Sequence, residues 1–331
     1  MALLEIKDLV TVFDTAQGTI RAVDHVSLSV ANSETVGVVG ESGCGKTMLA
    51  LSVMRLLPGR GKISHGEIIF SNKNLLTLSN EEIRAIRGSQ ISMIFQEPMT
   101  SLNPVFRVGE QIAEAIRLHR NVSAKEAVLM SVEQLREVGI PDPDKRARDY
   151  PHQLSGGMRQ RVMIAMAMSC HPQLLLADEP TTALDVTIQA QVIELIDELK
   201  NKNQMAVLFI THDLGLIARH AQRIAVMYAG KIVENAPADK IFVNPAHPYT
   251  QGLIDSLPGR SIAAGSTAPE YLKTIPGTVP SLYDLSPGCR FYERCSYGDG
   301  YCAENEPPLT VIDKTHLAAC WKTEKVLKRI K

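Results

Sequence analysis

A glycine-rich stretch of eight residues, GESGCGKT at Gly40–Thr47, constrains the fold of this chain more than any other feature. It fits the pattern G-x-x-x-x-G-K-[ST]. The apolar segment SETVGVVG precedes it and predicts a buried strand, and KTMLALSVMRLL follows it and predicts a helix. Such a loop curls so that several backbone N–H groups and the positive end of the helix point at one anion. The stretch therefore predicts a phosphate-binding loop.

Further segments extend the α/β pattern. QLLLAD and MAVLFITHD read as buried strands, and IQAQVIELIDELKNK between them reads as an amphipathic helix. Strands that alternate with helices favour a mainly parallel sheet covered on both faces. A helical insertion interrupts this pattern at about residues 105–150, and within it Ser123 and Glu126 have the spacing of a capping box. From about residue 243 the composition shifts toward proline, glycine and cysteine, which predicts a small irregular, cysteine-rich C-terminal extension.

The segments after the insertion contain two further candidate sites. QLLLADEP ends in two acids, of which Asp178 would hold Mg²⁺ and Glu179 would orient or deprotonate the attacking water. Upstream, LSGGMRQR opens a helix with exposed backbone donors at Ser155, Gly156 and Gly157, which makes a second anion site. One chain does not need two phosphate sites for one nucleotide, so the second site is expected to serve a nucleotide held by another chain.

A phosphate loop, LSGG, and then an apolar strand ending in Asp-Glu is an order that resembles ABC ATPase domains, over residues 1 to about 240. The resemblance implies a phosphate-loop NTPase fold of class α/β, with a RecA-like core, an antiparallel β subdomain and a helical subdomain at about 97–165. It assigns Gln96 to the sensing of Mg²⁺ and the attacking water, Asp185 to the dimer interface, and His212 to the γ-phosphate. Phe13 stands where the family stacks an aromatic ring on adenine, although a core role fits it equally well.

The predicted ligands of ATP and Mg²⁺ are thus spread along the whole cassette. Lys46 would reach the β- and γ-phosphates, and the hydroxyl of Thr47 would bind Mg²⁺. Catalysis is assigned to Glu179, His212 and Gln96, and Mg²⁺ binding to Thr47, Gln96 and Asp178. The nucleotide-binding residues are Phe13, Gly40, Ser42, Gly43, Cys44, Gly45, Lys46, Thr47, Gln96, Asp178, Ser155, Gly156, Gly157 and Asp185.

Charge and hydropathy limit where the chain acts. The net charge is −1 and the pI is near 6.8, so the basic excess of a dedicated nucleic-acid binder is absent and no nucleic-acid partner is expected. The N-terminal segment lacks the basic start and continuous apolar run of a secretory signal. No segment approaches the roughly 18 uninterrupted apolar residues of a membrane span. A cytoplasmic location is therefore expected, with any membrane role mediated by a partner.

Three segments narrow the resemblance to the ATP-binding subunits of dipeptide and oligopeptide importers (DppD or OppD type), a group that includes nickel importers. They are EPMTSLNPVFRVGEQI, NPAHPYTQGLI and IPGTVPSLYDLSPGCRFYERC. The resemblance implies a domain at 1–242 and an extension at 243–331. It also implies a second ATPase subunit, favoured as a paralogue, two transmembrane permease subunits, indirectly a solute-binding protein, and a location at the cytoplasmic face of the membrane. Residues 97–112 would receive a permease subunit. An exporter subunit and a soluble ABC protein of DNA repair or translation are the rival interpretations.

Four of the six cysteines lie near the C-terminus, at Cys289, Cys295, Cys302 and Cys320. Four thiolates can hold zinc or an iron–sulfur cluster, and the spacing of these residues does not decide between the two. A cytoplasmic location disfavours disulfides. The resemblance implies a [4Fe-4S] cluster with a structural role, with zinc second and disulfides third. Cys44 and Cys170 are expected to be small packing residues.

Overall fold

The computed structural model describes residues 2–96, 101–182, 184–257 and 274–328. The chain divides into two compact units. Unit 1 comprises residues 1–4, 30–34 and 70–209, and unit 2 comprises residues 5–29, 35–69 and 210–331. Residues 97–100 of the predicted permease-binding segment lie outside the described part.

Unit 1 combines sheet strands with a group of helices. Strand β6 (Ile91–Ile94) pairs in parallel with β7 (Leu174–Asp178), and β8 (Ala206–Thr211), whose last two residues belong to unit 2, follows β7 in the strand order. All residues of these strands are buried, which is why their sequences are continuous apolar runs. Unit 1 also contains β5 (Lys73–Asn74), α2 (Asn80–Ile86) and α8 (Val186–Asn203).

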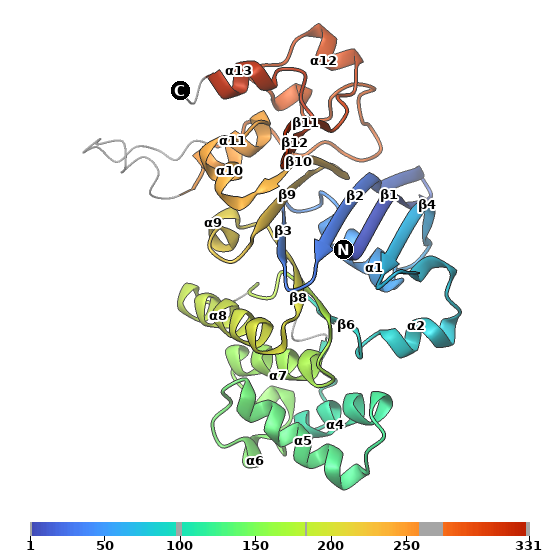
Figure 1. Ribbon diagram of the computed structural model, residues 1–331, viewed down its shortest axis with the longest axis vertical. Helices are drawn as coiled ribbons and strands as arrows, with labels where there is room; N and C mark the ends of the chain where they lie inside the picture. Colours follow the sequence, from blue (N-terminus) through green and yellow to red (C-terminus); the bar gives the residue numbers. More distant parts are fainter. Residues whose placement is uncertain (1, 97–100, 183, 258–273, 329–331) are drawn as a thin grey trace, which may run out of the picture. The chain divides into compact units, whose positions relative to one another are not determined.

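Three helices of unit 1 pack against one another (Figure 1): α4 (Val108–His119), α5 (Ala124–Glu137) and α7 (Gly156–Met168). The short helix α6 (Pro143–Arg146) follows α5. The predicted capping box of α5 is confirmed, since the Ser123 hydroxyl accepts from the Glu126 N–H at 3.3 Å and the Glu126 carboxylate accepts from the Ser123 N–H at 2.8 Å. The helical insertion expected at about 105–150 is thus present as regular helices.

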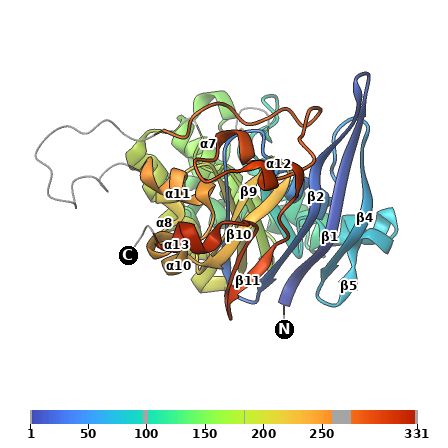
Figure 2. The ribbon, with the colours of Figure 1, turned by 90° about the horizontal axis from the view of Figure 1, so that it is seen from above.

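Unit 2 contains two groups of strands. In one, β2 (Gly18–Ala31), β1 (Ala2–Thr15) and β4 (Gly61–Phe70) lie side by side in this order (Figure 2). In the other, β3 (Thr35–Val39) pairs in parallel with β9 (Arg223–Tyr228). Helix α1 (Lys46–Met54) follows β3, so the strand and helix predicted on the two sides of the glycine-rich stretch are confirmed.

The C-terminal part of unit 2 continues the second group of strands. Strand β10 (Lys231–Pro237) pairs antiparallel with β9 on one side and with β12 (His316–Ala318) on the other, and β11 (Thr310–Asp313) completes the edge. Short helices surround these strands: α9 (Leu214–Ile217), α10 (Ala238–Val243), α11 (Pro248–Asp255), α12 (Gly300–Glu304) and α13 (Thr323–Lys328).

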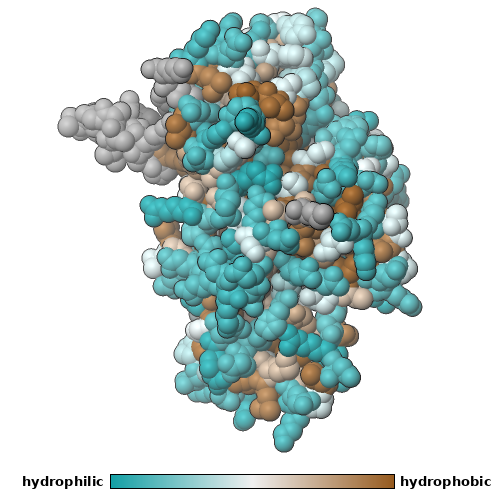
Figure 3. All heavy atoms as spheres, in the orientation of Figure 1, coloured by the Kyte–Doolittle hydropathy of each residue, from teal (hydrophilic) through white to brown (hydrophobic). Residues whose placement is uncertain are grey.

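The prediction of a cysteine-rich extension is not supported, because the cysteines are scattered along it, but short elements joined by irregular connections do make up its described residues. The unpaired edge of β10 offers backbone N–H and C=O groups that β12 satisfies, and this pairing makes the extension part of a sheet. The four cysteines belong to different elements and loops: Cys302 lies in α12, Cys295 ends a short 3₁₀ turn, and Cys289 and Cys320 lie in connections. Figure 3 shows mostly hydrophilic side chains on the visible face, with smaller hydrophobic patches between them.

Candidate nucleotide-binding site

Glycines fix the backbone of the loop between β3 and α1. A Cβ atom on Gly40 would lie 2.1 Å from the carbonyl oxygen of Met227, a contact that no side chain can make. Gly43 and Gly45 have φ angles of 81° and 106°, in the left-handed region that favours glycine. Gly45 caps α1 without a side-chain hydrogen bond, so no capping side chain competes for the N–H groups of the first turn. The loop therefore presents the N-terminus of α1 as an anion site.

Lys46 lies across this loop. Its side chain is buried, and its Nζ donates to the carbonyl oxygens of Gly40 at 2.7 Å and Glu41 at 3.0 Å. A phosphate oxygen carries the charge opposite to the ammonium, so it is a stronger acceptor than either carbonyl. Thr47, the next residue of α1, is half-buried. The residues of this loop thus fit the triphosphate of a nucleotide.

In unit 1, two predicted catalytic residues make contact. Because β6 and β7 are parallel, with Ile94 beside Ala177, the residues that follow them meet at one edge of the sheet. Gln96 Nε2 donates to Glu179 Oε2 at 3.3 Å. Asp178, the last residue of β7, is buried beside Glu179. The structure therefore brings the Gln96 amide and the Glu179 carboxylate together.

Glu179 is held in an unusual backbone conformation. Its φ angle is 45°, in the left-handed region where a non-glycine residue is uncommon. The side chain is 8% exposed, and its Oε2 also accepts from Thr182 Oγ1 at 3.0 Å. Strained backbone of this kind clusters at functional sites, where the surrounding structure holds it. The backbone conformation and the two hydrogen bonds of Glu179 thus hold its carboxylate in one position, as expected for a catalytic group.

The LSGG segment caps helix α7. Ser155 Oγ accepts from the Met158 N–H at 3.3 Å, and both Ser155 and Gly156 are exposed. A Cβ atom on Gly157 would lie 3.2 Å from Ile188, in the first turn of α8. Asp185 caps that helix by accepting from the Ile188 N–H at 3.0 Å. The structure therefore brings LSGG and Asp185 together at two neighbouring helix N-termini.

The remaining predicted residues belong to unit 2. The Phe13 ring is half-exposed and packs on Gly61, where a Cβ atom would lie 2.6 Å from Phe13 Cε1. Thr11, two residues earlier on the same face of β1, contacts Ser52 of α1 through its hydroxyl at 2.8 Å. His212 is exposed and follows β8. The core and adenine-stacking interpretations of Phe13 both remain compatible with this position.

Two residues that contact the phosphate loop at Glu41, namely Tyr249 and Arg294, were missed in the sequence. The Glu41 N–H donates to Tyr249 Oη at 2.8 Å, and Arg294 makes an ion pair with the Glu41 carboxylate. Glu41 stands at a variable position of the loop pattern, and no sequence pattern singled out Arg294 or Tyr249. A carboxylate inside a loop built for anions is the signal that could have pointed to a cationic partner.

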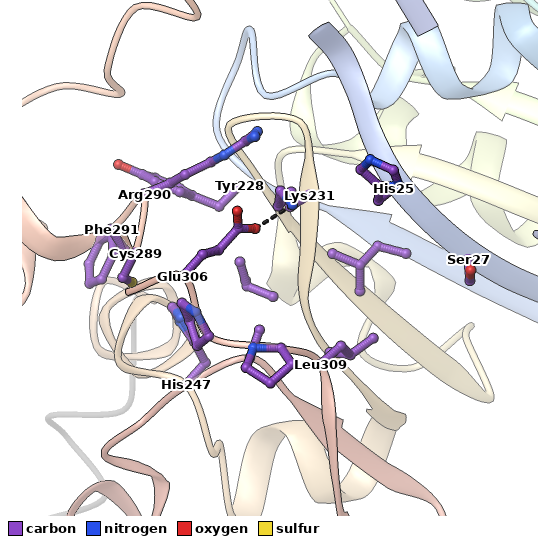
Figure 4. A pocket seen from close by; sticks show the side chains of 15 residues that line it. His25, Ser27, Tyr228, Lys231, His247, Cys289, Arg290, Phe291, Glu306 and Leu309 are labelled. Atoms are coloured by element: carbon purple, nitrogen blue, oxygen red, sulfur yellow. Dashed lines mark ion pairs between the residues drawn. The ribbon is translucent and has the colours of Figure 1, made fainter. Parts of the chain in front are cut away.

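Unit 2 also contains a cavity of about 410 Å³ beside β10 (Figure 4). Its lining includes His247, whose pKa burial lowers to about 3, so the ring is neutral at physiological pH. The charged groups at its wall are paired, since Lys231 forms an ion pair with Glu306 and Arg290 with Asp24. The cavity therefore presents an apolar wall and no isolated charge among these residues.

Comparison with known proteins agrees with this geometry. Residues 23–182 match the family described as ABC transporter, and residues 233–302 match the oligopeptide/dipeptide transporter C-terminal region. A probable peptide ABC transporter ATP-binding protein of Sinorhizobium fredii is 52% identical over 98% of this chain and 96% of its own length. The chain belongs to this family of ABC transporter ATP-binding proteins.

Two more similarities support the assignment. The dipeptide transport ATP-binding protein DppD of Bacillus subtilis is 48% identical over 96% of this chain and 94% of its own length. A dimeric ATP-binding cassette, solved in a post-hydrolysis state with ADP and Pi, superposes with a TM-score of 0.64 at 26% identity. It covers 71% of this chain and 98% of its own length. The fold is thus that of an ABC ATPase.

The prediction of an iron–sulfur cluster or zinc site in this family member is wrong. No group of three or more His, Cys, Asp or Glu residues that could hold a metal ion occurs in the described part of the chain. All six cysteines are free, and burial raises the pKa of Cys289 to about 11 and of Cys320 to about 12. Among the described helices, none has both the length and the apolar character needed to cross a membrane.

Proposed function

We propose that this protein is the ATP-binding and ATP-hydrolysing subunit of an ABC importer for dipeptides or oligopeptides. One observation carries the proposal: an ABC cassette at residues 23–182 and an oligopeptide/dipeptide transporter region at 233–302 occur in one chain. The relatives named as peptide or dipeptide transport proteins align along nearly its full length. The substrates of the enzyme are ATP and water, with Mg²⁺ as cofactor, and its products are ADP and phosphate.

In the proposed nucleotide site, different predicted residues bind the phosphates, the Mg²⁺ ion and the adenine. The glycine-rich loop and Lys46 bind the phosphates, and Thr47, Gln96 and Asp178 hold Mg²⁺, which would neutralise charge on the phosphates. Phe13 would contact adenine. These assignments are supported by the open anion site at α1 and by the position of Gln96 and Asp178 at the ends of parallel strands.

In the proposed reaction Glu179 orients the attacking water and accepts its proton. Hydrogen bonds from Gln96 and Thr182 hold the carboxylate in place. His212 would contact the γ-phosphate. Ser155, Gly156 and Gly157 would bind the nucleotide held by a second ATPase subunit, and Asp185 would lie at that interface. The exposed helix N-terminus at Ser155 supports this arrangement.

The proposed assembly places two ATPase subunits beneath two permease subunits at the cytoplasmic face of the membrane, supplied by a solute-binding protein. Within this chain, residues 1–242 would form the ATPase domain, with a helical subdomain at about 97–165, and residues 243–331 the extension. The structural match to a cassette solved as a dimer supports a pair of ATPase subunits.

Two substitutions test the function in the assembled transporter. Glu179→Gln keeps the size of the side chain but removes the base, so we expect MgATP binding to persist and the turnover rate to fall by about 10²–10⁴-fold. Lys46→Ala removes a phosphate ligand, so we expect weaker ATP binding. Lys202→Gln, at an exposed ion pair with Glu137, is the control that should leave both the ATP affinity and the turnover rate unchanged. Normal turnover in Glu179→Gln, or ATPase activity of the wild type that never responds to peptide-loaded binding protein, would contradict the proposal.

A further inference from the structure

Glu41 places a carboxylate inside the phosphate loop, between Gly40 and Ser42. An unpaired carboxylate at this point would repel the phosphates that the loop is built to bind. Arg294, more than 250 residues later in the sequence, neutralises it: Nη1 donates to Glu41 Oε2 at 2.7 Å and Nη2 to Oε1 at 2.9 Å. The ion pair is therefore bidentate, with one nitrogen on each carboxylate oxygen.

The guanidinium of Arg294 is fixed from several directions. Its side chain is only 5% exposed, and its Nε donates to the carbonyl oxygen of Pro276 at 2.8 Å. It also donates to Tyr228 Oη at 3.3 Å and lies over the rings of Tyr228 and Phe291, at 5.7 and 5.8 Å from their centroids. A guanidinium held in this way keeps its orientation when Glu41 or the loop moves.

A second hydrogen bond connects this region to the backbone of Glu41. Tyr249 of α11 is fully buried, and its Oη accepts from the Glu41 N–H at 2.8 Å. Its ring packs against Tyr228 and Phe291, with centroids 4.7 and 5.4 Å away. Both the side chain and the N–H of Glu41 are thus fixed by residues of the oligopeptide/dipeptide region, which spans residues 233–302.

Arg290 attaches the same segment at a neighbouring point. Its guanidinium donates to Asp24 and to the carbonyl oxygen of Ala229, in the turn between β9 and β10. The next residue, Gly230, donates its N–H to the carbonyl oxygen of Cys44 in the phosphate loop at 2.8 Å. The segment therefore touches the loop directly at Glu41 and through one turn at Cys44.

We propose that Arg294 is a positioning residue for ATP binding, which neutralises Glu41 and holds the phosphate loop open to the triphosphate. The inference deepens the proposed ATPase function and rests on it. It makes the C-terminal region an integral part of the nucleotide site, because without the guanidinium the loop carries an uncompensated negative charge. Other residues contact the reacting atoms, so Arg294 changes the affinity for ATP and not the rate of the chemical step.

The test measures the Kd of MgATP for the purified full-length chain by titration calorimetry. We expect Arg294→Gln to weaken binding about tenfold, because Glu41 is left charged and unpaired beside the phosphates. The double variant Glu41→Gln/Arg294→Gln removes that charge as well, so we expect its Kd to return to within about threefold of the wild type. A purely structural role of Arg294 would not give this rescue, since the second substitution restores no packing.

Two further variants keep the test decisive. Arg294→Lys retains the positive charge but not the bidentate contact, and we expect an intermediate Kd. Lys322→Gln breaks another ion pair of the C-terminal region, with Asp299 at 2.5 Å, without touching the loop, and we expect an unchanged Kd. If Arg294→Gln does not fold, Arg294→Lys and Glu41→Gln are compared instead, and equal wild-type affinity in both overturns the inference.

In the assembled transporter the same variants separate KM from kcat. Arg294→Gln should raise the KM for ATP and leave kcat nearly unchanged, because the chemical step uses other groups. A wild-type Kd in Arg294→Gln, or a double variant as weak as the single one, would overturn the proposal for Arg294. A wild-type chain that does not bind MgATP at all would instead remove the proposed ATPase function.

Discussion

Removing the carboxylate of Glu234 should destabilise the protein severely, although this residue is remote from any predicted catalytic role. Glu234 lies in β10 and is completely buried. Its oxygens accept from the N–H groups of Ala246 at 2.6 Å and His247 at 2.9 Å, and His316 Nε2 lies 2.7 Å from Oε1. A carboxylate can only accept, so His316 acts as a third donor. These contacts join β10, the start of α11 and β12.

The magnitude follows from what Glu234→Ala leaves behind. Three buried donors lose their acceptor, and each unsatisfied group costs about 1–3 kcal/mol. We therefore expect a loss of about 4 kcal/mol, which corresponds to a fall in Tm of roughly 10 °C at about 2–4 °C per kcal/mol. Glu234→Gln keeps one carbonyl acceptor and should lose about half as much.

Thermal unfolding followed by circular dichroism measures the effect, with Lys202→Gln as the exposed control that leaves Tm unchanged. The Tm of Glu234→Ala should be lower than the Tm of Glu234→Gln, and both should be lower than the Tm of the wild type. A Tm of Glu234→Ala within about 2 °C of the wild type would refute the reasoning, since three buried donors would then have found other partners at no cost.

Two further predictions concern steric fit and pH. Gly40→Ala should lower both the Tm and the ATP affinity, because the added Cβ would lie 2.1 Å from the backbone oxygen of Met227. Gly156→Ala is the control and should keep the wild-type Tm, because its Cβ would lie 3.9 Å from the nearest atom. Equal Tm values for the two variants would contradict the steric argument. The pKa of His247 falls from 6.5 to about 3 on folding because of burial, so the unfolded chain binds the extra proton between these values. Stability should therefore decrease as the pH falls from about 6.5, by up to ~1.4 kcal/mol per pH unit from this group. Denaturant unfolding at pH 7 and pH 5 should show a smaller pH effect in His247→Asn, whose amide can still cap α11; an identical slope in both proteins would exclude His247 as the cause.

The elements near the phosphate loop could be predicted because their signals are local. The apolar run before Gly40 and the helix after Lys46 need only the side chains that lie in them, and the capping box at Ser123 needs two residues three apart. Likewise the strand that ends at Asp178 is a continuous apolar run, as expected for a strand buried on both faces.

The C-terminal region shows where this reasoning stops. Its short strand β12 pairs with β10 across more than 70 residues of sequence, at Glu234 and Ala318, and no local pattern encodes that partner. The composition and the family resemblance suggested a cysteine-rich extension with a metal site; the cysteine-rich extension is not supported, and the metal site was wrong. Cysteines close in sequence become ligands only if the fold turns their thiolates toward one point.

The sequence by itself determined the chemistry of the phosphate loop, because the glycines, Lys46 and Thr47 act through backbone geometry that is local to eight residues. The sequence also identified Gln96, Asp178 and Glu179 as candidate site residues. Only the tertiary structure decided that Gln96 contacts Glu179, and that Arg294 neutralises Glu41. The reason is physical: an ion pair depends on distance in space, and the closing of a loop of some 250 residues is fixed by the packing of the whole unit, not by the residues at its two ends.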